Sequence, residues 1–220
     1  MESGFWNRRA ADLRQAIGTR RMRLAGMVLL SGRDGPAAAL PARTRREVLE
    51  GTHRSAAAAM IRDFLQPGDR VLEVGTGPGL TALLAAERTG PGQVVTYEAN
   101  PALAPLIRAN FALNDSAPDL RIAAISADGR DFPVAGHAPT PGLSVDAALA
   151  EHRANALVLD AGGSEVEILT AADLRRIARI ILATHPERTG PAAQRALEKT
   201  LVDRGFRVWA RAGATCLVTR

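Results

Sequence analysis

The sequence predicts an α/β fold in which a mostly parallel sheet carries helices on both faces. After residue 69, short apolar runs alternate with segments of helical periodicity. A glycine-rich turn joins the first of these runs to the helix behind it. The chain ends in two apolar runs around a tight turn at Gly213, which is typical of an antiparallel hairpin. Because parallel strands need crossover helices, this pattern predicts a doubly wound sheet.

The glycine-rich turn lies within residues 71–84, which read VLEVGTGPGLTALL. The apolar start predicts a strand, and the leucine spacing from Leu80 predicts a helix. Gly75, Gly77 and Gly79 between them allow backbone amides to approach a ligand closely. The helix that follows offers unpaired N–H groups at its first turn. The stretch therefore predicts a cradle for a small molecule.

The first 45 residues are interpreted as an extension, and residues 46–220 as the main domain. Leu13 and Ile17 predict an amphipathic helix, and residues 24–40 predict a hairpin with its turn at Gly32 and Gly35. We expect this extension to cover a pocket or to form a homodimer contact. A helix over residues 47–65, interrupted near Gly51, leads into the main domain.

The main domain is expected to contain seven strands separated by helices. The expected strands are residues 70–74, 94–98, 120–125, 156–160, 180–183, 206–210 and 215–219. The expected helices are residues 80–88, 101–114, 145–152, 165–178 and 191–204, and residues 133–142 form a loop rich in glycine and proline.

Composition limits the classes of partner. The chain has 220 residues and a single cysteine, Cys216, so no internal disulfide can form. We find neither a convincing signal peptide nor an apolar stretch long enough to span a bilayer, and we expect a cytoplasmic protein with no membrane partner. The net charge is +5, but the arginine blocks lie in the N-terminal quarter, outside the glycine-rich core. A nucleic-acid partner is therefore disfavoured, although such blocks do occur in proteins that bind RNA.

The spacing of the glycines discriminates among ligand classes. A P-loop needs a lysine after its glycines, and no lysine stands there. A dinucleotide site prefers G-x-G-x-x-G, whereas Leu80 occupies the place of the last glycine, so NAD stays open as a disfavoured alternative. The class that remains is S-adenosylmethionine, whose ammonium and sulfonium favour nearby acids. Glu73 precedes the turn, and Glu98 ends the next strand, where a carboxylate can accept hydrogen bonds from both ribose hydroxyls.

Longer stretches resemble a known family. The sequence VVTYEANPALAPLIRANFALN resembles a Glu-Pro-x-Pro and Leu-x-x-Asn-x-x-Leu-Asn pattern, and DAGGSE resembles an Asp-x-Glu-Gly-x-Glu pattern. The residues that match the first pattern are Glu98, Asn100, Pro101, Asn110, Leu113 and Asn114. Over about residues 47–211, the chain is similar to class I S-adenosylmethionine-dependent methyltransferases of the FkbM type.

The resemblance implies a Rossmann-like seven-stranded sheet in the order 3-2-1-4-5-7-6 with an antiparallel last strand. It also implies S-adenosyl-L-methionine as the donor and O-methylation of a small-molecule or sugar hydroxyl. We expect Asp128 to lie near the adenine, with the backbone N–H of Ala127 beside it. The expected cofactor residues are Glu73, Gly75, Thr76, Gly77, Gly79, Leu80, Glu98, Ala99, Ala127 and Asp128.

Two positions depart from the family pattern. Gly162 replaces the family's first glutamate after the fourth strand, so any acid, base or metal-holding role of that carboxylate is missing. Ala99 replaces the proline of Glu-Pro, which is a milder change because this residue lies on a loop. The glycine leaves three interpretations open: an altered acceptor, a base supplied elsewhere, or retained binding without catalysis.

Methyl transfer to a hydroxyl benefits from a general base. The main candidates are Asp160 at the end of the fourth strand, Glu165, and His185 after the fifth strand, and we expect no metal. His53 and His137 are weaker candidates. Two alternatives to a small-molecule O-methyltransferase stay open. One is an RNA-modifying enzyme that uses the arginine-rich N-terminus, and the other is a catalytically silent homologue that binds the cofactor.

Overall fold

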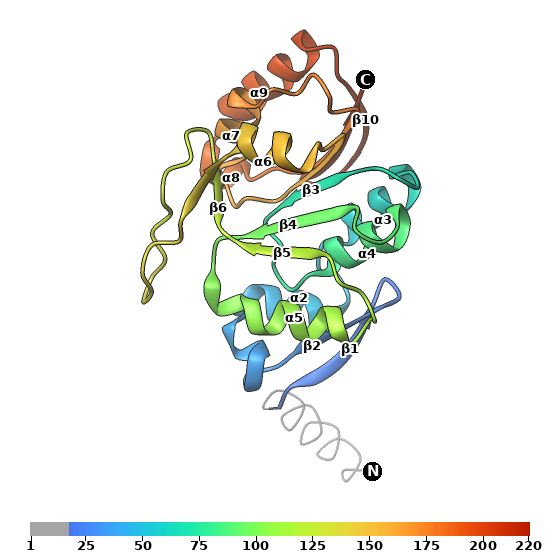
Figure 1. Cartoon of the computed structure of the whole chain (residues 1–220), viewed down its shortest axis with the longest axis vertical. Coiled ribbons are helices and arrows are strands. Elements are labelled where there is room, and N and C mark those ends of the chain that lie inside the picture. Colours follow the sequence, from blue (N-terminus) through green and yellow to red (C-terminus); the bar gives the residue numbers. More distant parts are fainter. Residues whose placement is uncertain (1–17) are drawn as a thin grey trace, which may run out of the picture.

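The computed structural model describes residues 18–220, and the amphipathic helix expected around Leu13 and Ile17 lies outside the described residues. Its centre is a seven-stranded sheet with helices on both faces (Figure 1). The strand order is β10-β11-β9-β8-β3-β4-β5, which is 3-2-1-4-5-7-6 when the seven strands are numbered along the chain. Their bounds are β3 Val71–Val74, β4 Val94–Glu98, β5 Asp119–Ile122, β8 Ala156–Leu159, β9 Arg179–Ala183, β10 Arg207–Ala212 and β11 Thr215–Thr219.

Strand directions follow from the connections. Each of β4 and β8 pairs in parallel with β3, and β9 pairs in parallel with β8. The last strand, β11, is antiparallel to both β9 and β10. The predicted α/β fold with a mostly parallel sheet and an antiparallel last strand is therefore confirmed.

Alternate side chains of the central strands enter two apolar cores, one on each face of the sheet. Val71 and Ala156 point into the core beneath α3, α4 and α5, whereas Leu72 and Leu157 point into the core beneath α6, α7 and α9. Both faces are buried, which explains why these strands read as continuous apolar runs. The helices are α3 Ser55–Phe64, α4 Leu80–Thr89, α5 Ala104–Ala112, α6 Val145–His152, α7 Glu165–Ala171 and α9 Pro191–Asp203.

An N-terminal hairpin packs beside α5, at the opposite end of the molecule from α9 (Figure 1). Its strands are β1 Arg20–Leu24 and β2 Met27–Ser31. The predicted turn at Gly32 and Gly35 is wrong, because the chain turns one strand earlier, at Ala25 and Gly26. Both residues have positive φ, as a tight two-residue hairpin turn requires, and an alanine there gives little sequence signal. Gly35–Ala39 forms a 3-10 helix, η1, instead.

Two asparagines of α5 and its C-terminal end hold this hairpin. Asn110 accepts a hydrogen bond from the backbone N–H of Leu30 and donates one to the carbonyl of Pro78, both at 2.7 Å. Asn114 accepts from the N–H of Val28 and donates to its carbonyl, also at 2.7 Å. The hairpin also shares an apolar core with α4 and α5. The division of the chain at residue 45 stays a prediction.

The interruption expected near Gly51 is confirmed, because Gly51 ends α2 (Ala42–Glu50) in the left-handed conformation and α3 follows. Two other expectations fail in their bounds. The strand expected at residues 120–125 divides into β5 and β6 (Ala124–Ser126), and β6 pairs with β7 (Gly142–Ser144) instead of the main sheet.

The helix expected to reach residue 178 ends at Ala171. The guanidinium of Arg204, which follows α9, donates hydrogen bonds to the carbonyls of Leu169, Thr170 and Ala172. These contacts satisfy carbonyl groups at the end of α7 that a longer helix would have paired internally. A contact across 32 to 35 residues leaves no mark on local periodicity.

Candidate active site

A cavity of about 340 Å³ opens at the carboxyl ends of β3, β4 and β8, where a doubly wound sheet binds its ligands. Polar side chains at the ends of β4 and β8 and at the start of α3 meet apolar side chains from the other segments of its wall. The lining residues are Leu40, Pro41, Thr44, Arg54, Val74, Gly75, Gly77, Tyr97, Glu98, Ala99, Leu103, Ala123, Ala124, Ile125, Phe132, Asp160, Ala161, Gly162 and Ser164.

Glycine is required at two places in the loop after β3. Gly75 has a φ of +89°, and a Cβ there would lie 2.0 Å from the carbonyl oxygen of Asp160. Gly79 has a φ of +94°, and its Cβ would lie 2.8 Å from the ring of Phe111. The two strand ends and α5 therefore approach the loop so closely that only a residue without a side chain fits.

Glu98 closes the glycine-rich loop from the neighbouring strand. One carboxylate oxygen accepts the N–H of Gly77 at 2.9 Å, and the other accepts the N–H of Asn100 at 2.8 Å. The side chain lines the cavity, and burial raises the pKa of its carboxyl above the ordinary value. Each carboxylate oxygen can accept a second hydrogen bond, so Glu98 retains the capacity for the ribose contacts expected of it.

Glu73 lies beneath the loop and is only 1 % exposed. The hydroxyl of Thr96 donates to its Oε2 at 2.5 Å, and that hydroxyl is 2.6 Å from the hydroxyl of Thr76. Burial raises the pKa of Glu73 to about 7, although Arg54 opposes the shift. Its Oε1 has no hydrogen-bond partner among residues 18–220 and is 3.9 Å from Nη1 of Arg54. Glu73 itself does not line the cavity, but its neighbour Arg54 does.

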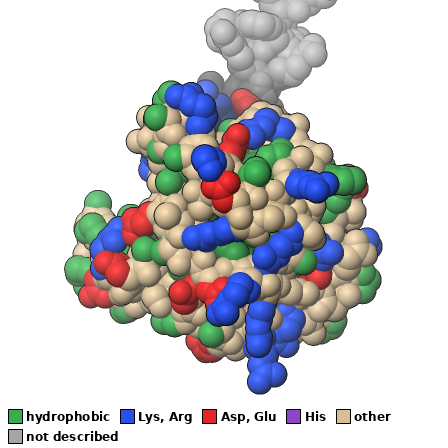
Figure 2. All heavy atoms as spheres, turned by 90° about the horizontal axis from the view of Figure 1, so that it is seen from above, with side chains coloured by type: hydrophobic (Ala, Val, Ile, Leu, Met, Phe, Trp, Pro, Cys, Tyr) green, Lys and Arg blue, Asp and Glu red, His purple; other side chains and the backbone are tan. Residues whose placement is uncertain are grey.

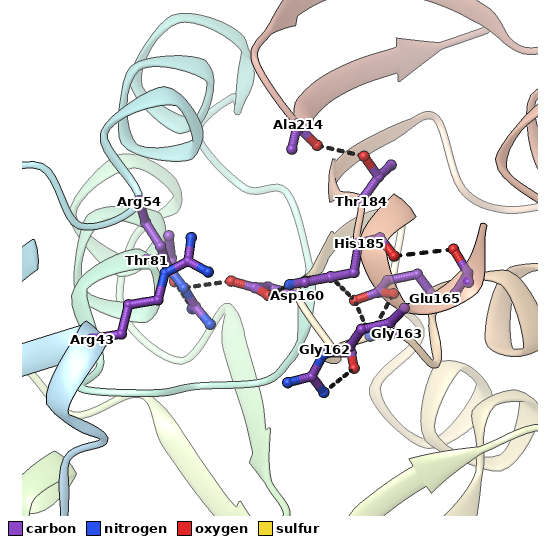
Figure 3. A network of polar contacts seen from close by, with 12 residues as sticks. Arg43, Arg54, Thr81, Asp160, Gly162, Gly163, Glu165, Thr184, His185 and Ala214 are labelled. Carbon is purple, nitrogen blue, oxygen red and sulfur yellow. Dashed lines mark hydrogen bonds and ion pairs between the residues drawn. The ribbon is translucent and has the colours of Figure 1, made fainter. Parts of the chain in front are cut away.

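Arg54 is the site residue that the sequence did not single out. Its Nε lies 2.8 Å from Oδ2 of Asp160, and its Nη1 donates to the hydroxyl of Thr81 at 2.9 Å (Figure 3). It precedes α3, whereas its partners follow β3 and β8, so only the fold brings them together. The available signal was its position in the segment before the first strand, next to the candidate His53.

The three predicted catalytic residues meet at the ends of β8 and β9 (Figure 3). The Nδ1 of His185 lies 2.8 Å from Oε1 of Glu165, and its Nε2 lies 3.4 Å from Oδ1 of Asp160. Glu165 is completely buried and accepts the N–H of Gly163 at 2.9 Å. The carboxylate of Glu165 raises the pKa of His185 above its ordinary value because it stabilises the imidazolium. Asp160 lines the cavity, and His185 lies behind it.

Oxygen and nitrogen atoms of Asp160, Glu165 and His185 all lie within 4.8 Å of one another, close enough to share a divalent cation. The guanidinium of Arg54 already supplies a positive charge beside Asp160. That charge disfavours a second cation at the same carboxylate. The absence of a metal stays a prediction.

Some of the remaining predicted cofactor residues lie at or near the cavity, and others lie away from its wall. Ala99 lines the cavity, while Thr76 and Leu80 are fully buried near it. Ala127 and Asp128 do not line it; Asp128 is exposed and pairs with Arg130 at 3.1 Å. Their proposed contact with adenine stays a prediction.

Neither of the two weaker histidine candidates lines the cavity. His53 is buried against Glu47, with 3.1 Å between Nδ1 and Oε2, and burial lowers its pKa to about 4. His137 is exposed on the loop before β7.

Two segments outside the glycine-rich core complete the wall. Leu40, Pro41 and Thr44 come from the N-terminal segment around the start of α2, and Phe132 comes from the loop before β7. No local pattern indicates these contacts, because apolar residues in loops do not show which surface they cover. The expectation that the extension covers a pocket agrees with the position of the first three residues.

The residues present fit S-adenosylmethionine. Gly75 and Gly77 line the cavity with backbone alone, and one buried oxygen of Glu73 has no hydrogen-bond partner among residues 18–220. The carboxyl groups of Glu73 and Asp160 lie beside the guanidinium of Arg54, so groups of both charges are present for a zwitterionic ligand. The apolar wall, which includes Leu103 and Ile125, suits an adenine ring.

Comparisons with known proteins agree with this fit. The family model described as protein-L-isoaspartate(D-aspartate) O-methyltransferase matches residues 48–166. The ribosomal protein L11 methyltransferase of Symbiobacterium thermophilum is 35% identical over 77 residues. These are 34% of this chain but only 25% of that relative, so the chain matches about a quarter of the relative's length.

Solved structures show the same fold. A precorrin-6y C5,15-methyltransferase of Geobacter metallireducens has a TM-score of 0.50 at 16% identity, covering 82% of this chain and 90% of that one. A tRNA (uracil-54, C5)-methyltransferase of Pyrococcus abyssi, in complex with S-adenosyl-L-homocysteine, has a TM-score of 0.52 at 14% identity. That match covers 91% of this chain and 42% of the other.

Proposed function

Because the chain belongs to the protein-L-isoaspartate(D-aspartate) O-methyltransferase family and is an S-adenosylmethionine-dependent methyltransferase, we propose that it methylates a hydroxyl oxygen of a small molecule, such as a sugar. The observation that carries this proposal is His185, held between the buried Glu165 and the cavity-lining Asp160. The resemblance to FkbM-type enzymes supports the same acceptor class. However, Asn110 and Asn114, which are two of the residues that match the FkbM-type pattern, accept hydrogen bonds from the N-terminal hairpin in this chain.

The nature of the acceptor follows from the base. A carboxylate such as that of L-isoaspartate is already ionised at neutral pH and needs no proton removed. A hydroxyl must lose its proton as the bond to carbon forms, and a positioned histidine accelerates that step. A histidine held by a fully buried carboxylate is therefore more useful to a hydroxyl acceptor than to a carboxylate acceptor.

Each polar residue has a distinct role in this proposal. When bound, S-adenosylmethionine supplies a methyl group on a cationic sulfur. Asp160 accepts the hydrogen bond of the acceptor hydroxyl at the cavity wall, and the proton of that hydroxyl passes through its carboxylate to Nε2 of His185, which lies 3.4 Å behind it. Glu165 fixes the ring through Nδ1 and stabilises the imidazolium that results. Gly162 stands where the FkbM-type pattern has a glutamate, so that carboxylate cannot act as the base. In this proposal His185 takes the role of the base.

The walls contribute alignment and the exclusion of water. Leu40 and Phe132, which are far apart in the sequence, both bring apolar surface to the cavity. In-line displacement requires the acceptor oxygen, the methyl carbon and the sulfur to be aligned, and a shaped apolar wall restricts the acceptor to that geometry.

The surface gives less support to an RNA acceptor. On the one face drawn in Figure 2, Lys and Arg side chains are numerous, and acidic side chains lie among several of them. Several of these arginines pair with acids, including Arg130 with Glu167 and Arg211 with Glu198. An RNA site would need a continuous basic surface that reaches the cavity.

The test supplies labelled S-adenosylmethionine with a panel of sugars and other hydroxyl compounds, an isoaspartyl peptide and ribosomal RNA. We expect label in a hydroxyl compound as an ether that survives mild alkali. Label that alkali releases as methanol would indicate a carboxyl ester, and label in RNA would indicate the nucleic-acid alternative; either result overturns the proposal. Measured cofactor binding with no transfer to any acceptor would favour the catalytically silent homologue.

The variants His185→Gln and Glu165→Gln distinguish roles within the active site. We expect His185→Gln to reduce kcat by about 100-fold or more, as loss of a general base does, while cofactor affinity stays within about twofold. Glu165→Gln should reduce kcat less and change its pH dependence. Unchanged kcat in His185→Gln would remove this residue from the mechanism.

The compartment is also a proposal. Among residues 18–220, no helix has the length and apolar character needed to cross a bilayer. Together with the free, buried Cys216, this supports the expectation of a reducing cytoplasm. Localisation of the tagged full chain by cell fractionation tests it.

A further inference from the structure

We propose that Arg54 binds the α-carboxylate of the cofactor's amino-acid end, and that this contact lets the cavity select S-adenosylmethionine and S-adenosylhomocysteine over adenosyl compounds without a carboxylate. The inference rests on cofactor use and does not depend on which acceptor is methylated. It concerns a residue that neither the sequence patterns nor the family resemblance indicated.

Arg54 is the cation on the cavity wall. Among the lining residues in the described part of the chain, no other lysine, arginine or histidine is present. Any anionic group of a ligand that enters this cavity therefore has Arg54 as its charged partner. S-adenosylmethionine carries one such group, the carboxylate, because it has no phosphate.

The guanidinium is held in place from one side. Nη1 donates to the hydroxyl of Thr81 at 2.9 Å and to the carbonyl of Thr76 at 3.4 Å, and Nε contacts Asp160 at 2.8 Å. Within residues 18–220, Nη2 makes no hydrogen bond. It lies beside the glycine-rich loop, 3.5 Å from the position that a Cβ on Gly77 would take. Nε also forms no hydrogen bond within these residues, so its contact with Asp160 is an ion pair. A guanidinium that is positioned through Nη1 and has Nη2 available is suited to a carboxylate, since little side-chain entropy is lost on binding.

The surrounding charges also favour a zwitterion. Glu73 and Asp160 place two carboxylates around the single guanidinium. A carboxylate ligand alone would add negative charge to this group, whereas the amino-acid end of the cofactor brings an ammonium with its carboxylate. Arg54 is thus expected to recognise the carboxylate, and the nearby acids to balance the ammonium.

Calorimetric titration tests the proposal with two ligands that differ at the carboxylate. S-adenosylhomocysteine retains it, and decarboxylated S-adenosylmethionine lacks it but keeps the ammonium. The proteins are the wild type, Arg54→Gln, and Arg46→Gln, which loses the same charge from an exposed position. Circular dichroism and thermal melting establish that each variant is folded.

We expect Arg54→Gln to weaken S-adenosylhomocysteine binding by about 10- to 100-fold, the range of a charge-assisted hydrogen bond, and to change the affinity for the decarboxylated compound less than threefold. Arg46→Gln should change neither affinity. A merely structural role for Arg54 would lower both affinities by the same factor, and that result would overturn the proposal, as would no change in either.

A second variant covers the case in which Arg54→Gln does not fold. Thr81→Val removes the hydroxyl that positions Nη1 and nearly preserves side-chain volume. We expect a smaller loss, about threefold to tenfold, confined to S-adenosylhomocysteine. Equal losses for both ligands, or none, would again contradict the assignment. Failure of the wild type to bind S-adenosylhomocysteine would instead refute cofactor use itself.

Discussion

The side-chain oxygen of Asn110 lies 2.7 Å from the backbone nitrogen of Leu30 and accepts its hydrogen bond. The amide nitrogen of the same side chain donates to the carbonyl of Pro78 in the glycine-rich loop. One buried asparagine therefore ties the N-terminal hairpin to the loop that forms the cofactor cavity. The segment that follows the hairpin contributes Leu40 to the cavity wall.

Replacing Asn110 by alanine should lower the free energy of unfolding by roughly 2–4 kcal/mol, because one buried and one partly buried backbone group lose their partners. Urea denaturation followed by circular dichroism measures the change. Arg108→Ala, at an exposed position of the same helix, should change it by less than about 0.5 kcal/mol. Equal effects of the two substitutions would show that the asparagine bridge contributes nothing particular.

Gly75→Ala should destabilise the protein by more than roughly 3 kcal/mol, because the new Cβ would overlap the carbonyl oxygen of Asp160. Gly68→Ala is the matched control. Gly68 also has positive φ, at +83°, but nothing lies within 4 Å of its Cβ position, so only the backbone cost of about 1 kcal/mol is expected. If the two variants melt at the same temperature, the close approach at Gly75 is not a constraint.

Glu73 should make stability fall as pH rises from about 4.5 to about 7. Burial raises its pKa from the ordinary 4.5 to about 7 on folding, so the folded protein binds a proton in that interval and is relatively less stable above it. The full effect is roughly 3 kcal/mol. Glu73→Gln should lose this pH dependence and gain stability at pH 8 relative to the wild type, as measured by denaturation at pH 5 and pH 8. A pH dependence identical to that of the wild type would contradict the assignment.

Glu165→Gln should lower the pKa of His185. The buried carboxylate stabilises the imidazolium, and the neutral amide removes that charge. Titration of the histidine ring signals by NMR measures the change, with His185→Gln identifying the signal among the four histidines. The signal of His152, which contacts the carbonyl of Gln93, should titrate as before. An unchanged or raised pKa for His185 would exclude the orienting role of Glu165.

Glu98→Ala should weaken S-adenosylmethionine binding by about 100-fold or more in a calorimetric titration. Its carboxylate lines the cavity and also fixes the backbone of Gly77, so both a ligand contact and the loop geometry are lost. Because the N–H groups of Gly77 and Asn100 lose their acceptor, we also expect a stability loss of about 1–3 kcal/mol. Unchanged affinity would show that Glu98 serves the loop alone.

Much of the fold could be predicted from the sequence because its signals are local. The apolar run from Val71, the glycines behind it and the return of leucine spacing each depend on neighbours within a few residues. The same holds for Glu98, whose place at a strand end follows from the strand itself. Alternation of strands and helices then restricts the sheet to a parallel arrangement with helices on both faces.

The sequence by itself thus determined the strands, the glycine turn, the type of cofactor and the acids that stand near it. The tertiary structure alone decided that Arg54 meets Asp160, that His185 lies between Asp160 and Glu165, and that Leu40 and Phe132 reach one cavity. It also moved the hairpin turn to Ala25 and Gly26. The physical reason is that periodicity and turn preference act along the chain, whereas ion pairs and cavity walls join segments that are distant in sequence and meet only when the sheet and its covering helices have packed.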